Sequence, residues 1–525
     1  MIKSIFSKLN ATIIVFILVS FISSCGGGDN DVWSNFKPLT EVDKHIADYY
    51  LQSMPQSAAS KQGNPSIYVD FSDGIIQAYT SNAQNKEIIS ALAQKLADKN
   101  DWYGLGKSFG DGIGKLEFAD DRDLFNKVTT PTNYIDLMAP IEKAIEKIVA
   151  SNNDAILITD FEEYTPDGKE QLFAYAKKYF IDWLNKGNSI TFFYTKYKEV
   201  NTKSKLSTDK NLYYAVFTYG ASSESGLKYK FIDALNGRNI TYQSFDLNPN
   251  PYAVRNDYGG KENTGIKSAT FSKFVNSNIN ALADSKLPYE FIGLNKAWNE
   301  DLKKQIDNYV VKVDQGDFIG KLFMNASNQQ AYQLKKLKVV VTNISDDFVK
   351  FARSNEAKKH APVLTKDAGK NDVWNDASKK DPITTACFDK KTNQLKPEWV
   401  YAPSDLSKNV WAEVFDINSK IFNDHLKNDP ANVELITVLH SNYKLKNVTK
   451  EDALIRVDYV IDEALPNIAN TQLNDFKWVS AIKKETGENN SLYESVRNAL
   501  QEVKPSGVVY SYFIKLKNNT KEAEK

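Results

Sequence analysis

Short apolar runs alternate with helical segments between residues 66 and 248, and this alternation limits the fold more than any other feature of the chain. The clearest run is residues 155–159, Ala-Ile-Leu-Ile-Thr, which is apolar up to its last position. A strand of this kind is buried on both faces, as the inner strands of an α/β sheet are. We therefore expect residues 66–248 to form a doubly wound, Rossmann-like α/β domain with a mostly parallel sheet.

This segment has a consistent order of strands and helices. Helices are recognised by apolar residues that recur every three or four positions, as Ile141, Ile145 and Ile148 do. On this basis we expect strands at 67–69, 102–105, 115–118, 155–159, 190–194 and 213–218, and helices at 85–99, 137–149, 169–186 and 228–235.

The pattern changes after residue 248. Residues 249–299 are turn-rich and form a connector without an assigned fold. Residues 300–525 carry widely spaced apolar runs, which predict a β-rich or α+β C-terminal domain. We expect strands at 337–341, 433–439, 454–460 and 508–516, and a helix at 492–503 that begins with a Ser491–Glu494 capping box.

The first 24 residues have the pattern of a secretory signal peptide. Lys3 and Lys8 precede the apolar run 12–22, which is shorter than the roughly 20 residues that cross a bilayer. Residues 22–25, Ile-Ser-Ser-Cys, resemble the lipobox of bacterial lipoproteins, and this resemblance implies cleavage before Cys25 and acylation of that cysteine. The alternative is a plain signal-anchor helix with an incidental cysteine.

Residues 25–65 are expected to link the anchor to the folded part. The stretch 26–31, Gly-Gly-Gly-Asp-Asn-Asp, resembles the start of lipoproteins of the Bacteroides group, and an amphipathic helix is expected at 40–54. The resemblance implies an outer-membrane lipoprotein that faces either the periplasm or the cell surface, with the membrane as a partner through Cys25.

Composition excludes several classes of function. The 66 basic residues balance 66 acidic ones, which argues against a nucleic-acid-binding protein. Two cysteines make no disulfide framework, and the four histidines lack zinc-ligand spacing. Cys387 has no histidine nearby and is expected to be a buried, inert thiol. Because no nucleophile elbow, phosphate loop or dinucleotide fingerprint is present, we do not expect an enzyme.

Polar residues follow the predicted strands where a ligand site of an α/β sheet would lie. Asp70 and Ser72 come after the first strand, Thr132 precedes a helix, and Asp160 comes after the strand 155–159. The carboxyl ends of parallel strands meet at one edge of a sheet, so these oxygens are expected to converge. Such an all-oxygen set suits Mg²⁺ or Mn²⁺.

This arrangement resembles the von Willebrand factor type A domain and its metal-ion-dependent adhesion site. That family has Asp-x-Ser-x-Ser after its first strand, a threonine before a central helix and an aspartate after its fourth strand. Asp70, Ser72, Thr132 and Asp160 match, whereas Gly74 replaces the second serine. The resemblance covers residues 66–248 and implies a metal ion that bridges to a carboxylate of a protein partner.

A simpler interpretation stays open for the same residues. Asp, Ser and Thr are common at strand ends and helix starts as caps and turn formers. The nearby acidic residues Asp120, Asp121 and Asp123, with Glu162 and Glu163, form clusters that are more typical of a solvated face than of a second ion site.

Three functions are therefore considered. The first is a membrane-anchored lipoprotein that binds a macromolecular partner through the A-like domain, with adhesion or protein binding as its role. The alternative is a glycan-binding component of a polysaccharide uptake system that uses exposed aromatic side chains. A metal-dependent hydrolase that uses Asp70 and Asp160 is less favoured.

Overall fold

A computed structural model gives the fold of the chain. Contacts divide it into two compact units, one formed by Met1–Tyr49 and Ile344–Asp405 and the other by Tyr50–Asn343 and Leu406–Lys525. The structure describes residues 33, 36–40, 42–53, 63–165, 167–200, 205–220, 226–238, 240–256, 275–276, 291–294, 316–411, 414–439, 453–479 and 488–516. The signal sequence, Cys25 and most of the connector 249–299 lie outside these residues. Within them, no helix is long and apolar enough to cross a membrane.

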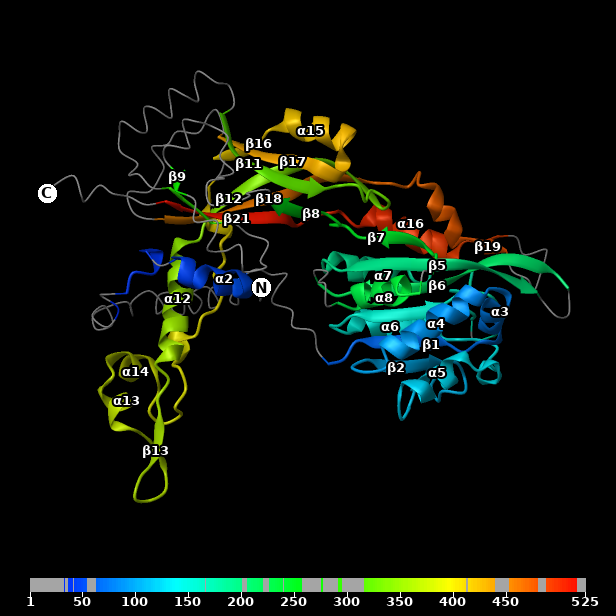
Figure 1. Cartoon of the computed structure of the whole chain (residues 1–525), viewed down its shortest axis with the longest axis horizontal. Helices are drawn as coiled ribbons and strands as arrows, with labels where there is room; N and C mark the ends of the chain where they lie inside the picture. Colours follow the sequence, from blue (N-terminus) through cyan, green and yellow to red (C-terminus); the bar gives the residue numbers. More distant parts are fainter. Residues whose placement is uncertain are drawn as a thin grey trace, which may run out of the picture. The chain divides into compact units, whose positions relative to one another are not determined.

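The larger unit contains a seven-stranded sheet with the strand order β3-β2-β1-β4-β6-β5-β7 (Figure 1). Its strands are β1 Ser66–Asp70, β2 Asp101–Leu105, β3 Ile113–Lys115, β4 Ala155–Thr159, β5 Ser189–Val200, β6 Ser207–Thr218 and β7 Gln243–Leu247. Only the β2-β1-β4 group is parallel, and every other neighbouring pair is antiparallel.

The expected mostly parallel sheet is therefore wrong, and the sheet is mixed. Strands β5 and β6 are long and pair along their whole length, from Ser189 with Thr218 to Val200 with Ser207. Only residues 201–206 join them, and such a short connection makes an antiparallel pair because a parallel pair needs a crossover of a dozen or more residues. The expectation of an α/β region is confirmed.

Helices cover both faces of this sheet. Strand side chains alternate between two apolar cores, so that Val69 and Ile158 face one core while Tyr68 and Leu157 face the other. The first core is closed by α3 Asp73–Ser81, α4 Ala83–Lys95, α5 Asp121–Thr129 and α8 Leu227–Asn236, and the second by α6 Ile141–Ala150 and α7 Lys177–Asn185.

The second core also takes residues from the end of the chain. Helix α16, Ser491–Glu502, packs on α7, and η7, Thr471–Phe476, places Phe476 against Phe192 and Tyr213. The helix expected at 492–503 is thus confirmed, but the Ser491–Glu494 capping box is wrong, because Asn490 is the N-cap and its side chain makes no capping hydrogen bond. This helix packs in the core of the seven-stranded sheet formed by residues 66–247.

The remaining strands of the larger unit form two further main sheets. One has the order β15-β12-β18-β21-β10-β9 and the other β16-β17-β11-β8. The main strands are β11 Gly316–Asn325, β12 Tyr332–Asn343, β17 Val433–Leu439, β18 Ala453–Pro466 and β21 Val508–Leu516. The shorter ones are β8 Ala253–Asn256, β9 Val275–Asn276, β10 Phe291–Leu294, β15 Val410–Trp411 and β16 Phe415–Ile417. A β-rich C-terminal region is confirmed, and the four expected strands lie in or at β12, β17, β18 and β21.

The smaller unit is built around helix α12, Ser345–Lys359. Asp347 on this helix is buried and accepts hydrogen bonds from the Tyr49 and Tyr401 hydroxyls at 2.9 and 2.8 Å. Cys387 packs in an apolar cluster with Trp33 and Trp374, so its expected burial is confirmed.

The other described elements of the smaller unit are short, apart from the start of α2, Val42–Ser53, which falls in the expected range 40–54. They are η1 Pro38–Thr40, β13 Leu364–Lys366, β14 Asp372–Trp374, α13 Asp376–Lys380, α14 Pro382–Cys387 and η3 Pro397–Trp399. The expected domain boundaries at residues 65, 248 and 299 stay a prediction.

Candidate functional site

The two aspartates predicted to meet lie at the ends of adjacent parallel strands. Asp70 ends β1, and Asp160 directly follows β4. Asp70 is 1% exposed, and its Oδ2 accepts a 2.7 Å hydrogen bond from the Thr159 hydroxyl. Its Oδ1 accepts a 2.8 Å bond from the backbone N–H of Ser72. The Asp70 carboxylate therefore ties the turn after β1 to the last residue of β4.

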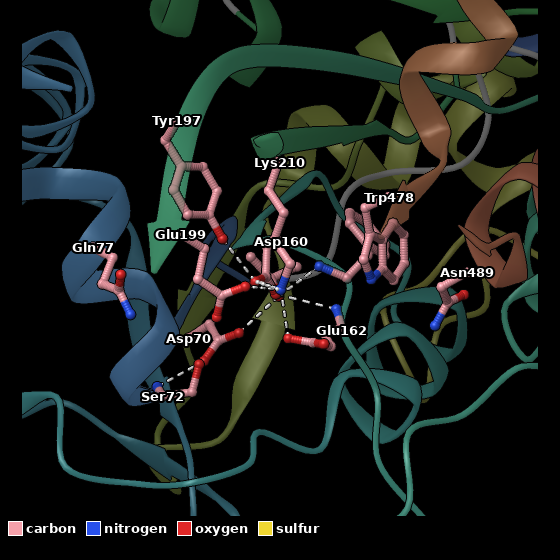
Figure 2. Close-up of polar contacts among 12 residues, drawn as sticks. Asp70, Ser72, Gln77, Asp160, Glu162, Tyr197, Glu199, Lys210, Trp478 and Asn489 are labelled. Atoms are coloured by element: carbon pink, nitrogen blue, oxygen red, sulfur yellow. Dashed lines mark hydrogen bonds and ion pairs between the residues drawn. The ribbon is translucent and has the colours of Figure 1, made fainter. Parts of the chain in front are cut away.

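A buried lysine lies among the carboxylates of this site. Lys210 on β6 points between the acidic side chains, and its Nζ is 3.5 Å from Asp160 Oδ2 and 2.6 Å from Glu162 Oε2 (Figure 2). Glu199, at the end of β5, brings Oε2 to 2.8 Å from the same nitrogen. The Lys210 side chain is only 2% exposed. We call Asp70, Asp160, Glu162, Glu199 and Lys210 the Lys210 cluster.

Tyr197 completes the surroundings of Asp160. Its hydroxyl donates a 2.9 Å hydrogen bond to Asp160 Oδ2, the oxygen that also faces Lys210. Tyr197 and Glu199 lie two residues apart on β5, so their side chains leave the same face of the strand. The long β5–β6 hairpin thus supplies three of the groups that surround the aspartates.

Burial and crowding shift the acid–base properties of the cluster. Burial, followed by repulsion from Asp160, raises the pKa of Asp70 to about 7. Burial also raises the pKa of Glu162 to about 7, against the opposing attraction of Lys210. Burial alone would lower the pKa of Lys210, but Glu162 and Asp160 outweigh it and hold that pKa well above its usual value. Lys210 is therefore a permanent cation at neutral pH.

Of the other two predicted metal ligands, Ser72 lies beside Asp70 and Thr132 does not. Ser72 stands beside Asp70 as the N-cap of α3, although its hydroxyl makes no cap hydrogen bond. Thr132 lies in η2, Pro131–Asn133, and is exposed to solvent. The residue of that loop that reaches the turn after β1 is Asp136, whose carbonyl accepts the Asp73 N–H at 2.8 Å.

The Asp136 carboxylate fixes the turn after β2 in the same region. It accepts hydrogen bonds from the backbone N–H and the hydroxyl of Ser108. Gly106 has φ +150°, and a Cβ at this position would overlap the Asp136 carboxylate. The sequence gives a signal for this contact only in the unusual glycine content of residues 104–114.

These residues do not fit a divalent cation as they are arranged. Among the described residues, no group of three or more His, Cys, Asp or Glu side chains is placed to hold a metal ion. The Lys210 ammonium stands between Asp160, Glu162 and Glu199, where an ion would need their oxygens. Thr132 faces solvent, and Gly74 offers no hydroxyl. The Mg²⁺ or Mn²⁺ site therefore stays a prediction without a matching ligand set.

The neighbouring acidic residues behave as helix caps. Asp120 Oδ1 accepts the Asp123 N–H at 2.8 Å at the start of α5, and Asp123 pairs with Lys127 at 3.2 Å. Asp120 and Asp121 are exposed, so the solvated face expected of that stretch is confirmed. The solvated face expected of Glu162 and Glu163 is wrong, because these side chains are only 10% and 8% exposed.

A groove of about 800 Å³ lies next to the cluster. Glu163 and Tyr164, the two residues that follow Glu162 in the chain, are part of its lining. Glu163 is 8% exposed. Its Oε2 accepts a 2.7 Å hydrogen bond from the Glu142 N–H in the first turn of α6, while burial raises its pKa to about 7. The other lining residues are Lys107, Gly110, Asp111, Gly112, Met138, Ala139, Pro140, Glu142, Lys143, Glu146, Thr165, Gln171 and Tyr179.

Large apolar side chains close in the chain to residues that line this groove are strongly exposed. Ile135 and Leu137, three residues and one residue before the lining residue Met138, are 68% and 72% exposed. Leu172 and Phe173, next to Gln171, are 55% and 75% exposed. Phe173, Leu137 and Ile135 are the three most exposed large apolar side chains of the described part of the chain.

Part of the C-terminal segment is anchored near this groove. Glu170 Oε1 accepts hydrogen bonds from Trp478 Nε1 at 3.2 Å and from Asn489 Nδ2 at 2.6 Å. These bonds fix the Glu170 side chain, at the start of the segment 170–173. The exposed Leu172 and Phe173 lie two and three residues after this anchored glutamate.

Comparisons with known proteins found no match for this chain among protein-family models, curated proteins or solved structures.

Proposed function

We propose that this chain is a membrane-anchored lipoprotein that binds another protein through the groove beside the Lys210 cluster. The observation that carries the proposal is the exposure of Phe173, Leu137 and Ile135, which lie within three residues in the chain of Gln171 and Met138 in the lining of a groove of about 800 Å³. Exposed large apolar side chains that gather in one region of a protein surface mark an interaction site more often than scattered ones do. The anchor is Cys25, which places the protein at the outer membrane, facing the periplasm or the cell surface.

The groove favours a partner segment with apolar and basic side chains. Its lining residues include the acidic Asp111, Glu142, Glu146 and Glu163, against two lysines. Acidic side chains beside an apolar surface attract a complementary basic segment and repel an acidic one. The half-buried Tyr164 and Tyr179 give such a segment aromatic surface within the groove.

A von Willebrand factor A-like fold for residues 66–248 forms part of the same proposal. It is supported by the position of Asp70 and Asp160 after two adjacent parallel strands, β1 and β4, and by helices on both faces of the sheet. The binding function that we propose uses the same edge of the sheet, but its recognition is made by apolar contacts and charge.

Selection of peptides on the protein tests the binding surface. The mature lipid-free chain, with Cys25→Ser, is used to select from a random phage-displayed peptide library. We expect enriched peptides with apolar and Lys or Arg residues that lose binding at least tenfold to the double variant Leu137→Ser/Phe173→Ser. Val363→Ser is the matched control, because Val363 is 59% exposed but lies in the smaller unit. Peptides that bind the double variant equally well would contradict the proposal.

The glycan-binding alternative has one feature in its favour. Tyr164 and Tyr179 lie in a groove that also holds carboxylates, and aromatic faces with polar neighbours can stack on sugar rings. A glycan array separates the two functions. Glycan signals that disappear in both Tyr164→Ala and Tyr179→Ala, together with no enriched peptide, would favour the uptake role.

The anchor is tested independently of the groove. In cells fed an alkyne analogue of palmitate, the wild-type chain is expected to be labelled and to sediment with the outer membrane. The Cys25→Ser variant is expected to lose both the label and the membrane fraction, whereas Cys387→Ser retains both. Membrane association without a label would favour the signal-anchor alternative.

A further inference from the structure

The buried ammonium of Lys210 has the surroundings of a bound cation. Three carboxylates from three places in the chain face it, namely Asp160 after β4, Glu162 two residues later and Glu199 at the end of β5. A lysine carries three N–H donors, so three acceptors can be served by one ammonium. The side chain is as buried as a core residue, with 2% exposed.

The cluster contains more negative than positive groups. Asp160, Glu162 and Glu199 face a single ammonium, and Asp70 lies close enough to Asp160 for the two carboxyl groups to repel each other. Burying several like charges is strongly unfavourable unless a cation or protons compensate them. Removal of Lys210 would therefore leave a compact set of carboxylates that attracts any cation of suitable size.

One oxygen of the cluster is available to a ligand. Glu162 Oε2 pairs with Lys210, but Glu162 Oε1 is buried and accepts no hydrogen bond from the described residues. The Glu162 side chain is 10% exposed. An unsatisfied buried carboxylate oxygen is rare, and here it points to a site that could accept one more cationic contact.

We propose that Lys210 is a built-in cation that holds this cluster together in place of a metal ion, and that a neutral residue at position 210 converts the cluster into a divalent-cation site. Wild-type protein then needs no metal to keep the ends of β1 and β4 together. This inference concerns the buried cluster and does not rest on the groove or its partner.

The first arm of the test uses the wild-type chain. Mn²⁺ is titrated into the mature lipid-free protein (Cys25→Ser) and followed by calorimetry and by electron paramagnetic resonance of free Mn²⁺. We expect no saturable binding and no change in melting temperature. One-to-one Mn²⁺ binding that Asp160→Asn abolishes would overturn the proposal.

The second arm uses Lys210→Met, which keeps much of the side-chain volume and removes the charge. We expect saturable Mn²⁺ binding, and at 100 times the dissociation constant an increase in melting temperature on the order of 5 °C. Lys228→Met is the matched control, because Lys228 is partly buried and pairs with a single carboxylate, Asp246, at 3.3 Å. This control should not bind Mn²⁺.

A third variant covers the case in which Lys210→Met fails to fold. In Lys210→Met/Glu199→Gln one carboxylate is neutralised together with the ammonium, which reduces the repulsion and leaves three carboxylates. We expect this variant to gain Mn²⁺-dependent stability as well. If neither variant gains stability or binding from Mn²⁺, the proposal is overturned.

Discussion

Lys210 Nζ lies 2.6 Å from Glu162 Oε2. This salt bridge is almost fully buried, at the end of the seven-stranded sheet where β1 and β4 finish. The two residues come from β6 and from the turn after β4, which are neighbours in the sheet. Burial of an unpaired charge is far less favourable than burial of a pair, so each partner requires the other. The aspartates that the sequence singles out are therefore part of a buried, charged cluster.

The shifted carboxyl groups predict how stability depends on pH. Asp70, Glu162 and Glu163 have pKa values raised to about 7 by burial, from ordinary values of 3.8 and 4.5. Between about pH 4.5 and 7 the folded chain therefore binds more protons than the unfolded chain, and these groups lower the free energy of unfolding as pH rises. Urea unfolding at pH 4.5, 5.5, 6.5 and 7.5 measures this slope.

Removal of one of these carboxyl groups should make the free energy of unfolding fall less steeply as pH rises. We expect Glu163→Gln to reduce the slope by up to about 1.4 kcal/mol per pH unit, the effect of one proton. Asp123→Asn is the control, because hydrogen bonds from Ala119 and Lys127 hold the pKa of Asp123 below its ordinary value. A slope that is unchanged in Glu163→Gln would contradict the expected burial of this carboxyl group.

Two threonines should respond differently to the same substitution. Thr159 is fully buried and donates to Asp70, so Thr159→Val should lower the free energy of unfolding by about 1–3 kcal/mol. Thr132 is exposed in η2, and Thr132→Val should change that free energy by less than about 0.5 kcal/mol. Chemical denaturation of both variants gives the comparison, and equal effects would count against the described positions.

Gly74→Ser restores the serine that the resemblance leads one to expect. A Cβ at position 74 would lie 3.6 Å from Glu199 Oε1 and 3.9 Å from Asp160 Oδ2, which are ordinary contacts. Because Gly74 lies in α3, serine should leave stability unchanged or raise it by about 0.5 kcal/mol. With Lys210 present, calorimetry should detect no Mn²⁺ binding. Saturable binding would mean that the missing hydroxyl, and not Lys210, excludes the ion.

Gly106 should be intolerant of a side chain. Its φ of +150° and its contact with the Asp136 carboxylate predict that Gly106→Ala lowers the free energy of unfolding by about 3 kcal/mol or more. Gly187 also has a positive φ, +79°, but faces open space, so Gly187→Ala should lower it by only about 1–2 kcal/mol. Thermal unfolding of the two variants measures the difference, and a similar loss in both would show that the contact with Asp136 is unimportant.

The sequence predicts the parts of the fold that local patterns determine. The run 155–159 is β4, and the convergence of Asp70 and Asp160 follows from the adjacency of parallel strands. The amphipathic pattern of 492–503 likewise locates α16. The packing of α16 on α7 depends on residues hundreds of positions apart, and no local pattern encodes it.

Glu199 and Lys210, the cluster members on β5 and β6, lie in a stretch where the hydrophobic pattern of the sequence is misleading. Residues 195–212 contain many charged side chains, so the strands appear to end at residue 194 and to begin again at 213. In the structure β5 and β6 continue through this stretch and place Glu199 and Lys210 beside the aspartates. A buried lysine looks like a surface residue in sequence, because only the tertiary structure supplies the carboxylates that neutralise it.

The most direct test of this interpretation is the affinity of a groove-selected peptide for the wild-type mature chain, measured by calorimetry first with Mg²⁺ and Mn²⁺ and then in excess chelator. Because Lys210 already supplies the positive charge of the cluster, we expect the same dissociation constant under both conditions. Binding that disappears in chelator and returns with Mg²⁺ or Mn²⁺ would contradict both a metal-free cluster and metal-independent recognition at this edge.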